Sequence, residues 1–317
     1  MKKFILNIKD LSKIIIYTDM DKISKKLLVS RNISKTIPAS IQYLGNVHNI
    51  DESINYILLL NDKVSYFNVD KKNNIATIFV KECNFFFPDL VYLAMGMFAN
   101  DLQKKQLYFI QSSVVKYDDF NSIMFLGNPN SGKTSMAYSL MKNYGYSLVS
   151  NDNVLVDSNR TVCGTKDMQM RLGTIKTFFP EILPYVDVPK EDEGRNIWDI
   201  KLYINDYLIK KGFNLNADTS IITDIYNLKI YKSGETIIKK RESIDEILMM
   251  HEELTKQIRS NRYAIVSMGY PLPSFEGEKY MQQRFNIAIE MSNKINIYDA
   301  YGTIKSLTKK IGEKYGK

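Results

Sequence analysis

The sequence predicts an α/β protein in which a smaller α+β domain precedes a larger α/β domain. Two observations point to this class. From residue 107 onward, short apolar runs typical of strands alternate with helical patterns, which favours a sheet covered by helices. One of these strands is joined to the following helix by a glycine-containing loop. The polar stretch 100–106 separates the two regions, so we expect an N-terminal domain over residues 1–105 and a second domain over residues 106–317.

In the first domain, three short runs are typical of strands, and the last two are joined by a polar turn over 70–74: 56–60, 64–69 and 75–81. A helix is expected to open at Pro88 and Asp89, because proline suits the first helical turn and an acid suits the positive end of the helix dipole. Its apolar residues recur at the spacing of one buried helix face, namely Leu90, Leu93, Ala94 and Met97.

The second domain contains five expected strands and four expected helices. The strands are 107–115, 123–126, one around 148–149, 221–230 and 295–298. The helices run from the glycine loop to about residue 143, from residue 243 onward, over 276–293 and over 302–315.

Composition excludes several functional classes. Only two cysteines and two histidines occur in 317 residues, which argues against a disulfide framework, a zinc site or a histidine-rich metal centre. The longest apolar stretch, 85–98, is too short to span a membrane and contains Pro88 and Asp89. We therefore expect a cytoplasmic protein with no membrane partner.

The net charge of +8 is concentrated partly in the lysine-rich C-terminal stretch 305–317. A solvated helix face explains such a stretch better than a binding patch, and no nucleic-acid-binding motif accompanies it. We expect no nucleic-acid partner. The sequence leaves open whether the chain forms a homo-oligomer.

One motif carries most of the chemical information. The run Gly127-Asn128-Pro129-Asn130-Ser131-Gly132-Lys133-Thr134 matches the P-loop (Walker A) pattern G-x-x-x-x-G-K-[ST], with an apolar strand before it and a helix after it. Glycines let backbone N–H groups turn inward around phosphate oxygens, and the helix N-terminus adds its positive dipole end. The motif predicts a nucleotide site in which Lys133 neutralises the β- and γ-phosphates of ATP and the Thr134 hydroxyl holds Mg²⁺. The expected nucleotide-binding set is Gly127, Asn128, Pro129, Asn130, Ser131, Gly132, Lys133, Thr134 and Ser135.

The region around this loop, about 107–156, resembles the P-loop core of the HPr kinase/phosphorylase-like proteins, a group related in fold to phosphoenolpyruvate carboxykinase. The resemblance rests on the strand 108–115, the loop itself, and the strand end Leu148-Val149-Ser150-Asn151-Asp152. It implies a P-loop kinase fold and transfer of the γ-phosphoryl group of ATP to a hydroxyl. In the family, two acids at this strand end supply a base for the attacking hydroxyl and a contact to Mg²⁺.

The sequence departs from the family pattern at two positions. Ser112 stands where the family has a histidine, and Asn151 replaces the first acid of the pair. An amide cannot take a proton, so the acid–base work, the metal contact, or both, pass to Asp152. The expected catalytic residues are thus Asp152, Lys133 and Asn151, and the expected metal ligands are Thr134 and Asp152. A simple turn residue is the alternative interpretation of Asp152.

These residues favour an ATP-dependent kinase whose acceptor is a peptide or a small hydroxy compound. Ser112 and Asn151 argue against the carrier protein HPr as the acceptor. Two alternatives stay open, namely a nucleotide-gated binding module (a pseudokinase) and a P-loop NTPase. The sequence does not separate ATP from GTP or pyrophosphate as the phosphate source.

Five weaker candidate residues lie elsewhere in the chain. Asp224 ends an apolar run as a Walker-B acid would, although a surface strand end explains it equally well. Arg171, Arg195 and Lys201 flank a polar stretch where the family has a mobile loop, and a charged surface loop is the preferred interpretation. Arg284 lies on an apolar helix face and needs a partner, for which a carboxylate is favoured over a bound phosphate.

Overall fold

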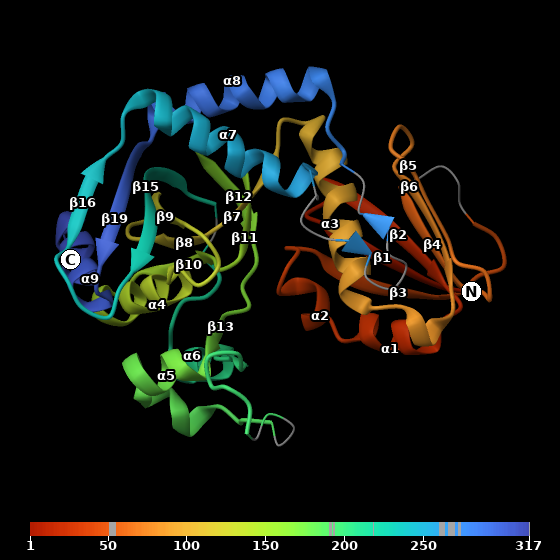
Figure 1. The fold of residues 1–317 in the computed structure, drawn as a ribbon, viewed down its shortest axis with the longest axis horizontal. Coiled ribbons are helices and arrows are strands. Elements are labelled where there is room, and N and C mark those ends of the chain that lie inside the picture. The colour runs from red at the N-terminus through yellow and green to blue at the C-terminus, as the bar shows by residue number, and fades with distance from the viewer. Residues whose placement is uncertain are drawn as a thin grey trace. The chain divides into compact units, whose positions relative to one another are not determined.

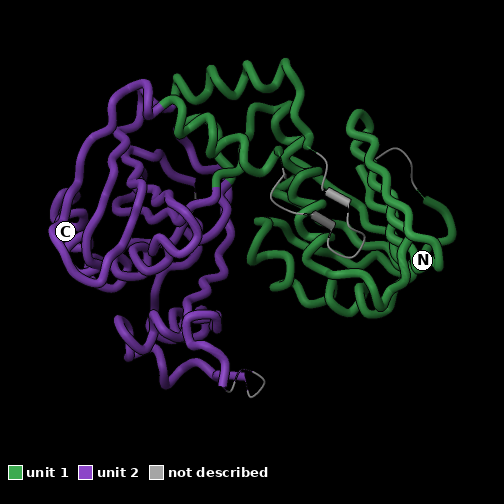
Figure 2. The backbone as a smooth tube through the Cα atoms, in the orientation of Figure 1, with its two compact units in different colours: residues 1–110, 155–158, 247–290 green, residues 111–154, 159–246, 291–317 purple. Residues whose placement is uncertain are grey.

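The protein is a mixed α/β chain, as the sequence predicts (Figure 1). The computed structural model describes residues 1–50, 55–189, 192, 194–217, 219–259, 264–265, 270–271 and 274–316. Its contacts divide the chain into two compact units, coloured separately in Figure 2. Unit 1 comprises Met1–Ile110, Leu155–Ser158 and Ile247–Glu290, and unit 2 comprises Gln111–Val154, Asn159–Glu246 and Met291–Lys317. Unit 1 therefore includes two segments that the linear division at residue 105 assigns to the second domain.

Unit 1 is built on a six-stranded sheet with the order β3-β1-β2-β4-β6-β5. The strands are β1 (Lys2–Ile8), β2 (Ser12–Thr18), β3 (Ser40–Asn46), β4 (Tyr56–Asn61), β5 (Tyr66–Asp70) and β6 (Ile75–Val80). The predicted strands 56–60 and 75–81 are confirmed, and the predicted strand 64–69 begins two residues later, at Tyr66. The polar turn between β5 and β6 joins antiparallel neighbours, as expected.

Helices of unit 1 supply most of the rest of its core. They are α1 (Asp21–Leu28), α2 (Arg31–Ser34), η1 (Glu82–Asn84), α3 (Phe87–Gln103), and parts of α7 (Ser243–Arg259) and α8 (Glu278–Lys294). Helix α3 packs on β2. All four apolar residues predicted for its buried face are at most 1% exposed. The two short strands β17 (Ala264–Ile265) and β18 (Tyr270–Pro271) pair with each other.

Unit 2 contains the main part of a nine-stranded sheet. The path runs β10-β8-β9-β15-β12-β11-β7, and β19 lies beside both β15 and β16. The strands are β7 (Tyr108–Gln111), β8 (Ser113–Lys116), β9 (Asn121–Leu126), β10 (Ser147–Ser150), β11 (Asn153–Asp157), β12 (Arg160–Gly164), β15 (Ile221–Ile230), β16 (Ile237–Lys240) and β19 (Asn296–Gly302). The predicted single strand 107–115 is two strands, because the chain leaves the ladder at Ser112.

Strand direction in this sheet brings two loops to one edge. β8 is antiparallel to both β9 and β10, so β9 and β10 run the same way and their carboxyl ends lie at the same edge. β15 is parallel to β9 and to β19. Helix α4 (Lys133–Tyr144) packs against β8, β9 and β10, and α9 (Ile304–Lys314) packs beside α4. The loops after β9 and β10 are therefore neighbours above α4.

A small group of elements extends from this sheet within unit 2. It consists of the two-stranded ribbon β13 (Gln169–Arg171) and β14 (Lys201–Tyr203), together with α5 (Leu172–Phe178), η2 (Pro180–Tyr185) and α6 (Asn205–Lys210). These elements lie together at the lower left of Figure 1. Their apolar side chains, among them Met170, Ile175 and Leu208, belong to the same core cluster as Phe125 and Leu140. The ribbon is thus packed firmly beside the β9–α4 loop.

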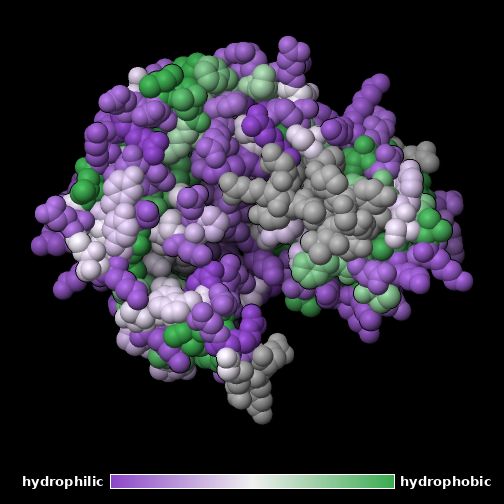
Figure 3. Space-filling view, in the orientation of Figure 1, coloured by the Kyte–Doolittle hydropathy of each residue, from purple (hydrophilic) through white to green (hydrophobic). Residues whose placement is uncertain are grey.

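The surface is mainly polar. Hydrophilic side chains dominate the face shown in Figure 3, and the hydrophobic ones form several small groups. In the part of the chain that the structure describes, no helix combines the length and the apolar character that a membrane crossing requires.

Candidate functional site

The loop between β9 and α4 has a fixed, unusual backbone. Asn130 and Gly132 have positive φ angles of 69° and 102°, and α4 begins directly after Gly132. A Cβ atom at Gly132 would overlap the Ile230 side chain, so only glycine fits there. The loop is tied to β15, because the Ile230 N–H donates to the Ser131 carbonyl at 3.1 Å. The positive end of the α4 dipole therefore lies at a loop of defined shape, which is a suitable place for an anion.

One side chain of the loop adds to this anion-binding character. The Lys133 ammonium folds back over the loop and donates to the carbonyls of Gly127 and Asn128, at 2.7 and 3.2 Å. The Ser131 hydroxyl is buried, has no hydrogen-bond partner within the described ranges and does not line the cavity beside the loop. The fit of the loop to a phosphate group therefore rests on Lys133 and on the N-terminus of α4.

A cavity of about 530 Å³ opens beside the loop. Three parts of unit 2 line it. The loop and the start of α4 contribute Pro129, Asn130, Gly132, Lys133, Thr134 and Ser135; the ends of β7 and β10 contribute Gln111, Asn151 and Asp152; and the ribbon region contributes Gln169, Met170, Arg171, Thr174, Trp198, Asp199 and Lys201. Gly127, Asn128 and Ser131, the other three predicted nucleotide-binding residues, do not line the cavity and instead shape the loop.

Asp152 follows the carboxyl end of β10 and lines the same cavity as the loop. Its backbone is held in place because its N–H donates to Thr165 Oγ1 at 3.0 Å and its carbonyl accepts from the Ser112 N–H at 2.8 Å. Burial raises the pKa of its carboxyl group, against the opposing effects of the Gln111 amide and the charges of Lys133 and Lys201. The cavity therefore contains a carboxyl group with increased proton affinity that senses the charge of the loop lysine.

Asn151 lines the same cavity, and its side-chain amide is held by hydrogen bonds within the protein. Its Nδ2 donates to the Asp167 carbonyl at 3.0 Å, and its Oδ1 lies 3.4 Å from Ser113 Oγ. Its side chain thus holds the segment after β12 against the end of β10. A carboxylate at this position would lose the donor on which the Asp167 carbonyl depends.

Ser112, which stands at the family's histidine position, is fully buried and does not line the cavity. Its hydroxyl has no hydrogen-bond partner among the residues described. Its main contact is the backbone bond to Asp152, which joins the break between β7 and β8 to the end of β10.

The two predicted metal ligands, Thr134 and Asp152, both line the cavity. No cluster of three or more His, Cys, Asp and Glu residues suitable for a metal ion occurs in the described ranges. Mg²⁺ does not need such a cluster, because it keeps several waters and is bound through one or two protein oxygens plus substrate phosphates. A hydroxyl and a carboxylate that line one cavity fit that kind of site.

Sequence reasoning identified only part of the cavity wall. Arg171 and Lys201 line it, whereas Arg195 forms an ion pair with Asp192 outside it. Trp198 and Gln111 were not predicted. They reach the cavity through the ribbon and through β7, and neither has a local pattern that indicates a site.

The Walker-B interpretation of Asp224 has no support in the geometry. Asp224 pairs in register with Ile123 of β9, three residues before that strand ends at Leu126. It is therefore well inside the sheet rather than at the edge where the loops meet. Its carboxylate forms an ion pair with Lys314 at 2.7 Å and does not line the cavity.

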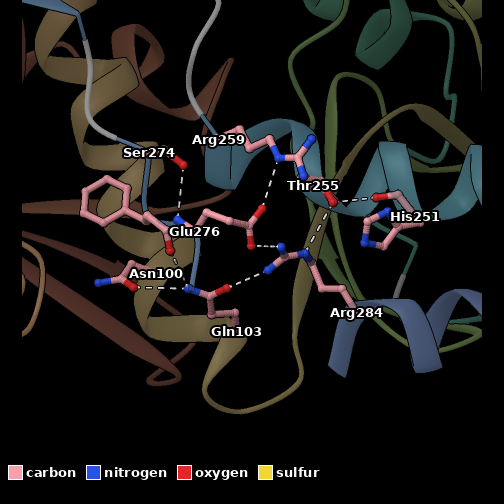
Figure 4. Close-up of polar contacts among 9 residues, drawn as sticks. Asn100, Gln103, His251, Thr255, Arg259, Ser274, Glu276 and Arg284 are labelled. Carbon is pink, nitrogen blue, oxygen red and sulfur yellow. Dashed lines mark hydrogen bonds and ion pairs between the residues drawn. The ribbon is translucent and has the colours of Figure 1, made fainter. Parts of the chain in front are cut away.

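Arg284 has the carboxylate partner that the sequence predicts. Figure 4 shows its guanidinium group pointing toward Glu276, Gln103 and Thr255. The side chain is fully buried in unit 1, with hydrogen bonds of 2.9 Å to Gln103 Oε1 and 3.3 Å to Thr255 Oγ1. Its contacts join α8 to α3, to α7 and to the segment just before α8.

No protein-family model matches the chain, and no curated protein is significantly similar to it. The resemblance to HPr kinases therefore stays a prediction from the loop and strand-end residues. The case for function rests on the geometry of the cavity.

Proposed function

We propose that the protein is an ATP-dependent phosphotransferase that moves the γ-phosphoryl group to a hydroxyl of a small-molecule or peptide acceptor. One observation carries the proposal: a single cavity is lined by Lys133 and Thr134 of the phosphate loop and by Asp152, whose carboxyl group has a raised pKa. A carboxyl group of raised proton affinity in the phosphate cavity can receive the proton of an acceptor hydroxyl.

The proposed roles follow from the chemistry of each group. Lys133 and the N-terminus of α4 hold the β- and γ-phosphates, and Thr134 and Asp152 provide oxygens for Mg²⁺, which neutralises phosphate charge. The acceptor oxygen forms a bond to the γ-phosphorus while the bond to the β,γ-bridging oxygen breaks, and ADP leaves. Asp152 receives the proton of the acceptor hydroxyl. A positioned base of this kind contributes a factor of about 10² to 10⁴.

The test uses γ-labelled ATP, Mg²⁺ and a fractionated cell extract. The Lys133→Ala variant should transfer no label to any acceptor, because it lacks the cation that holds the transferring phosphates. Lys309→Ala is the matched control, since Lys309 is exposed on α9 and only forms a 3.8 Å ion pair with Glu313. It should transfer label like the wild type.

Each outcome of this experiment has a distinct meaning. Label that the wild type alone moves to a non-water acceptor supports the kinase, and mass spectrometry of that fraction identifies the substrate. Label released only as inorganic phosphate would favour an NTPase. Bound ATP with no movement of label would favour the nucleotide-gated binding module.

Asp152→Asn separates catalysis from binding. The variant keeps the shape of the side chain and the contact with Gln111, which lies 3.5 Å away, but cannot take a proton. We expect turnover to fall at least 100-fold while the Kd for ATP without Mg²⁺ changes less than about threefold. Equal losses in both quantities would make Asp152 a binding residue only.

A further inference from the structure

The ribbon wall of the cavity contains two cations in an unfavourable arrangement. Arg171 of β13 and Lys201 of β14 are direct cross-strand partners in an antiparallel pair, and both line the cavity. Like charges directly opposite each other destabilise a strand pair. The two positive charges must therefore be balanced, either by other residues of the protein or by a bound anion.

Arg171 is neutralised within the protein. Its guanidinium group donates to Asn130 Oδ1 at 3.0 and 2.8 Å, bonds the Trp198 carbonyl, and lies 3.5 Å from the Asp199 carboxylate. These contacts fasten the ribbon wall to the phosphate loop. The hydrogen bonds of Arg171 thus join two walls of the cavity, and its charge is already balanced by protein groups.

Lys201 has no such partners. Lys201 is exposed, and its side chain forms no hydrogen bond or ion pair with any residue in the described ranges. Its charge nevertheless acts on the Asp152 carboxyl group. The cavity therefore contains a cation without a hydrogen-bonded partner among the described residues, near enough to the proposed base to act on its carboxyl group, while the nucleotide phosphates have Lys133 and the start of α4.

Trp198 adds an apolar surface to the same cavity. Its ring packs so closely on Gly173 that a Cβ atom there would overlap it, which fixes the ring in the wall. A fixed aromatic face and an ammonium group in one cavity suit a ligand with a short carbon skeleton and an oxyanion.

We propose that the acceptor is a small hydroxy compound that also carries a carboxylate or a phosphate ester, and that Lys201 binds this oxyanion. Trp198 contacts the carbon skeleton, and the hydroxyl lies toward Asp152. The assignment of the hydroxyl rests on the proposed function, whereas anion binding at Lys201 can be measured without any turnover.

The test uses Trp198 itself as the reporter, because it is the only tryptophan in the chain. Glycerate and glycerol 3-phosphate are titrated into the protein with saturating Mg²⁺ and ADP, and tryptophan fluorescence is followed. Glycerol is the neutral control. At least one anionic probe should give a saturable change at concentrations where glycerol gives none, and the two probes distinguish a carboxylate site from a phosphate site.

Two variants assign the response to the cation. Lys201→Gln should weaken binding of the anionic probe about ten- to a hundredfold, the usual value of a charge-assisted hydrogen bond. Lys232→Gln should leave it unchanged, because Lys232 lies 6.0 Å from the Trp198 ring centroid but does not line the cavity. The Kd for a fluorescent ADP analogue should be the same in both variants, which also shows that they are folded.

Several results would overturn the proposal. They are no response to either anion, an equal response to glycerol, an unchanged response in Lys201→Gln, or competition between the anion and ADP. A weaker affinity for the ADP analogue in Lys201→Gln would assign Lys201 to the nucleotide instead. Loss of phosphoryl transfer with an intact anion response would contradict only the proposed function.

Discussion

Asn151 illustrates how one residue can constrain the chemistry of its neighbours. It stands where the resembled family has an acid, and yet its amide forms a contact that an acid cannot make, the 3.0 Å bond to the Asp167 carbonyl. The backbone of the segment that contains Asp167 is therefore held by an amide donor that a carboxylate cannot replace. Restoring a carboxylate would also place a second negative charge beside Asp152.

Asn151→Asp should consequently lower both stability and turnover. Removing the hydrogen bond from the Asn151 amide to the Asp167 carbonyl should reduce the free energy of unfolding by about 1–3 kcal/mol. Urea denaturation and single-turnover transfer of label measure the two effects, with Asn216→Asp in an exposed loop as the control. Unchanged stability together with faster transfer would instead identify Asn151 as a degraded catalytic position.

At the scale of single residues, the sequence predicted the loop and Asp152 because both belong to one continuous motif region. Lys133, Thr134 and Asp152 do line one cavity. Gln111 and Trp198 could not be predicted, since they enter the cavity only through the pairing of β7 and the position of the ribbon. Residues brought in by tertiary structure leave no signal in local spacing.

Among the elements, α9 depends on a close approach to α4. Gly312 lies where a Cβ atom would overlap the Tyr144 ring. Replacing a helical glycine with alanine ordinarily stabilises a helix by up to about 1 kcal/mol. Here the extra methyl group has no space.

Gly312→Ala should therefore destabilise the protein by about 1–3 kcal/mol, the usual cost of overpacking. The free energy of unfolding in urea is the measurement. Gly277→Ala is the control, since a Cβ atom at Gly277 would be in ordinary contact with Tyr280 at 3.5 Å. A stability gain in Gly312→Ala would mean that α4 and α9 are packed less closely than described.

Element prediction was most successful where apolar residues recur along a whole strand. The run 221–230 is β15 from end to end, and six of its ten residues are apolar or aromatic, namely Ile221, Ile222, Ile225, Tyr226, Leu228 and Ile230. The break at Ser112 was missed, since Leu107 to Val115 is apolar on both sides of it. β1, β2 and β3 were not predicted individually.

For the whole molecule, the Arg284 cluster contributes a pH dependence. Although burial raises the pKa of Glu276, the contacts with Arg284 and Arg259 outweigh this effect and hold it below its ordinary value. A carboxylate with a lowered folded-state pKa stabilises the protein above its unfolded pKa, and this stabilisation is lost as pH falls through the folded value. His251, another titratable group near Arg284, has its pKa lowered by burial and by the same two arginines.

Glu276→Gln should lower stability by about 3 kcal/mol at pH 7, because Arg284 then lacks its counter-charge. The difference from the wild type should begin to shrink as pH falls below the ordinary glutamate pKa of about 4.3, and it should vanish only below the lowered folded-state pKa of Glu276. Comparing the two proteins at each pH cancels the contribution of His251. Glu278→Gln, which removes an exposed carboxylate, is the control, and a difference that stays constant with pH would contradict the assignment.

Unit 1 is made of three separate segments of the chain, and this arrangement could not be predicted from the sequence. The contact between Gln103 and Arg284 joins residues 181 positions apart, and no local pattern encodes such a pairing. The sequence correctly assigned Arg284 a carboxylate partner from the cost of a buried charge alone, but not the segment that supplies it.

This interleaving has a consequence for how the protein is made. A ribosome releases the chain from its N-terminus, yet Gln103 meets Arg284 only after most of the polypeptide has been synthesised. β19 is later still, and both β15 and β16 pair with it. Neither unit can therefore finish folding early, and a nascent chain stalled before residue 280 would expose unpaired strand edges and apolar helix faces, which is the state that chaperones bind.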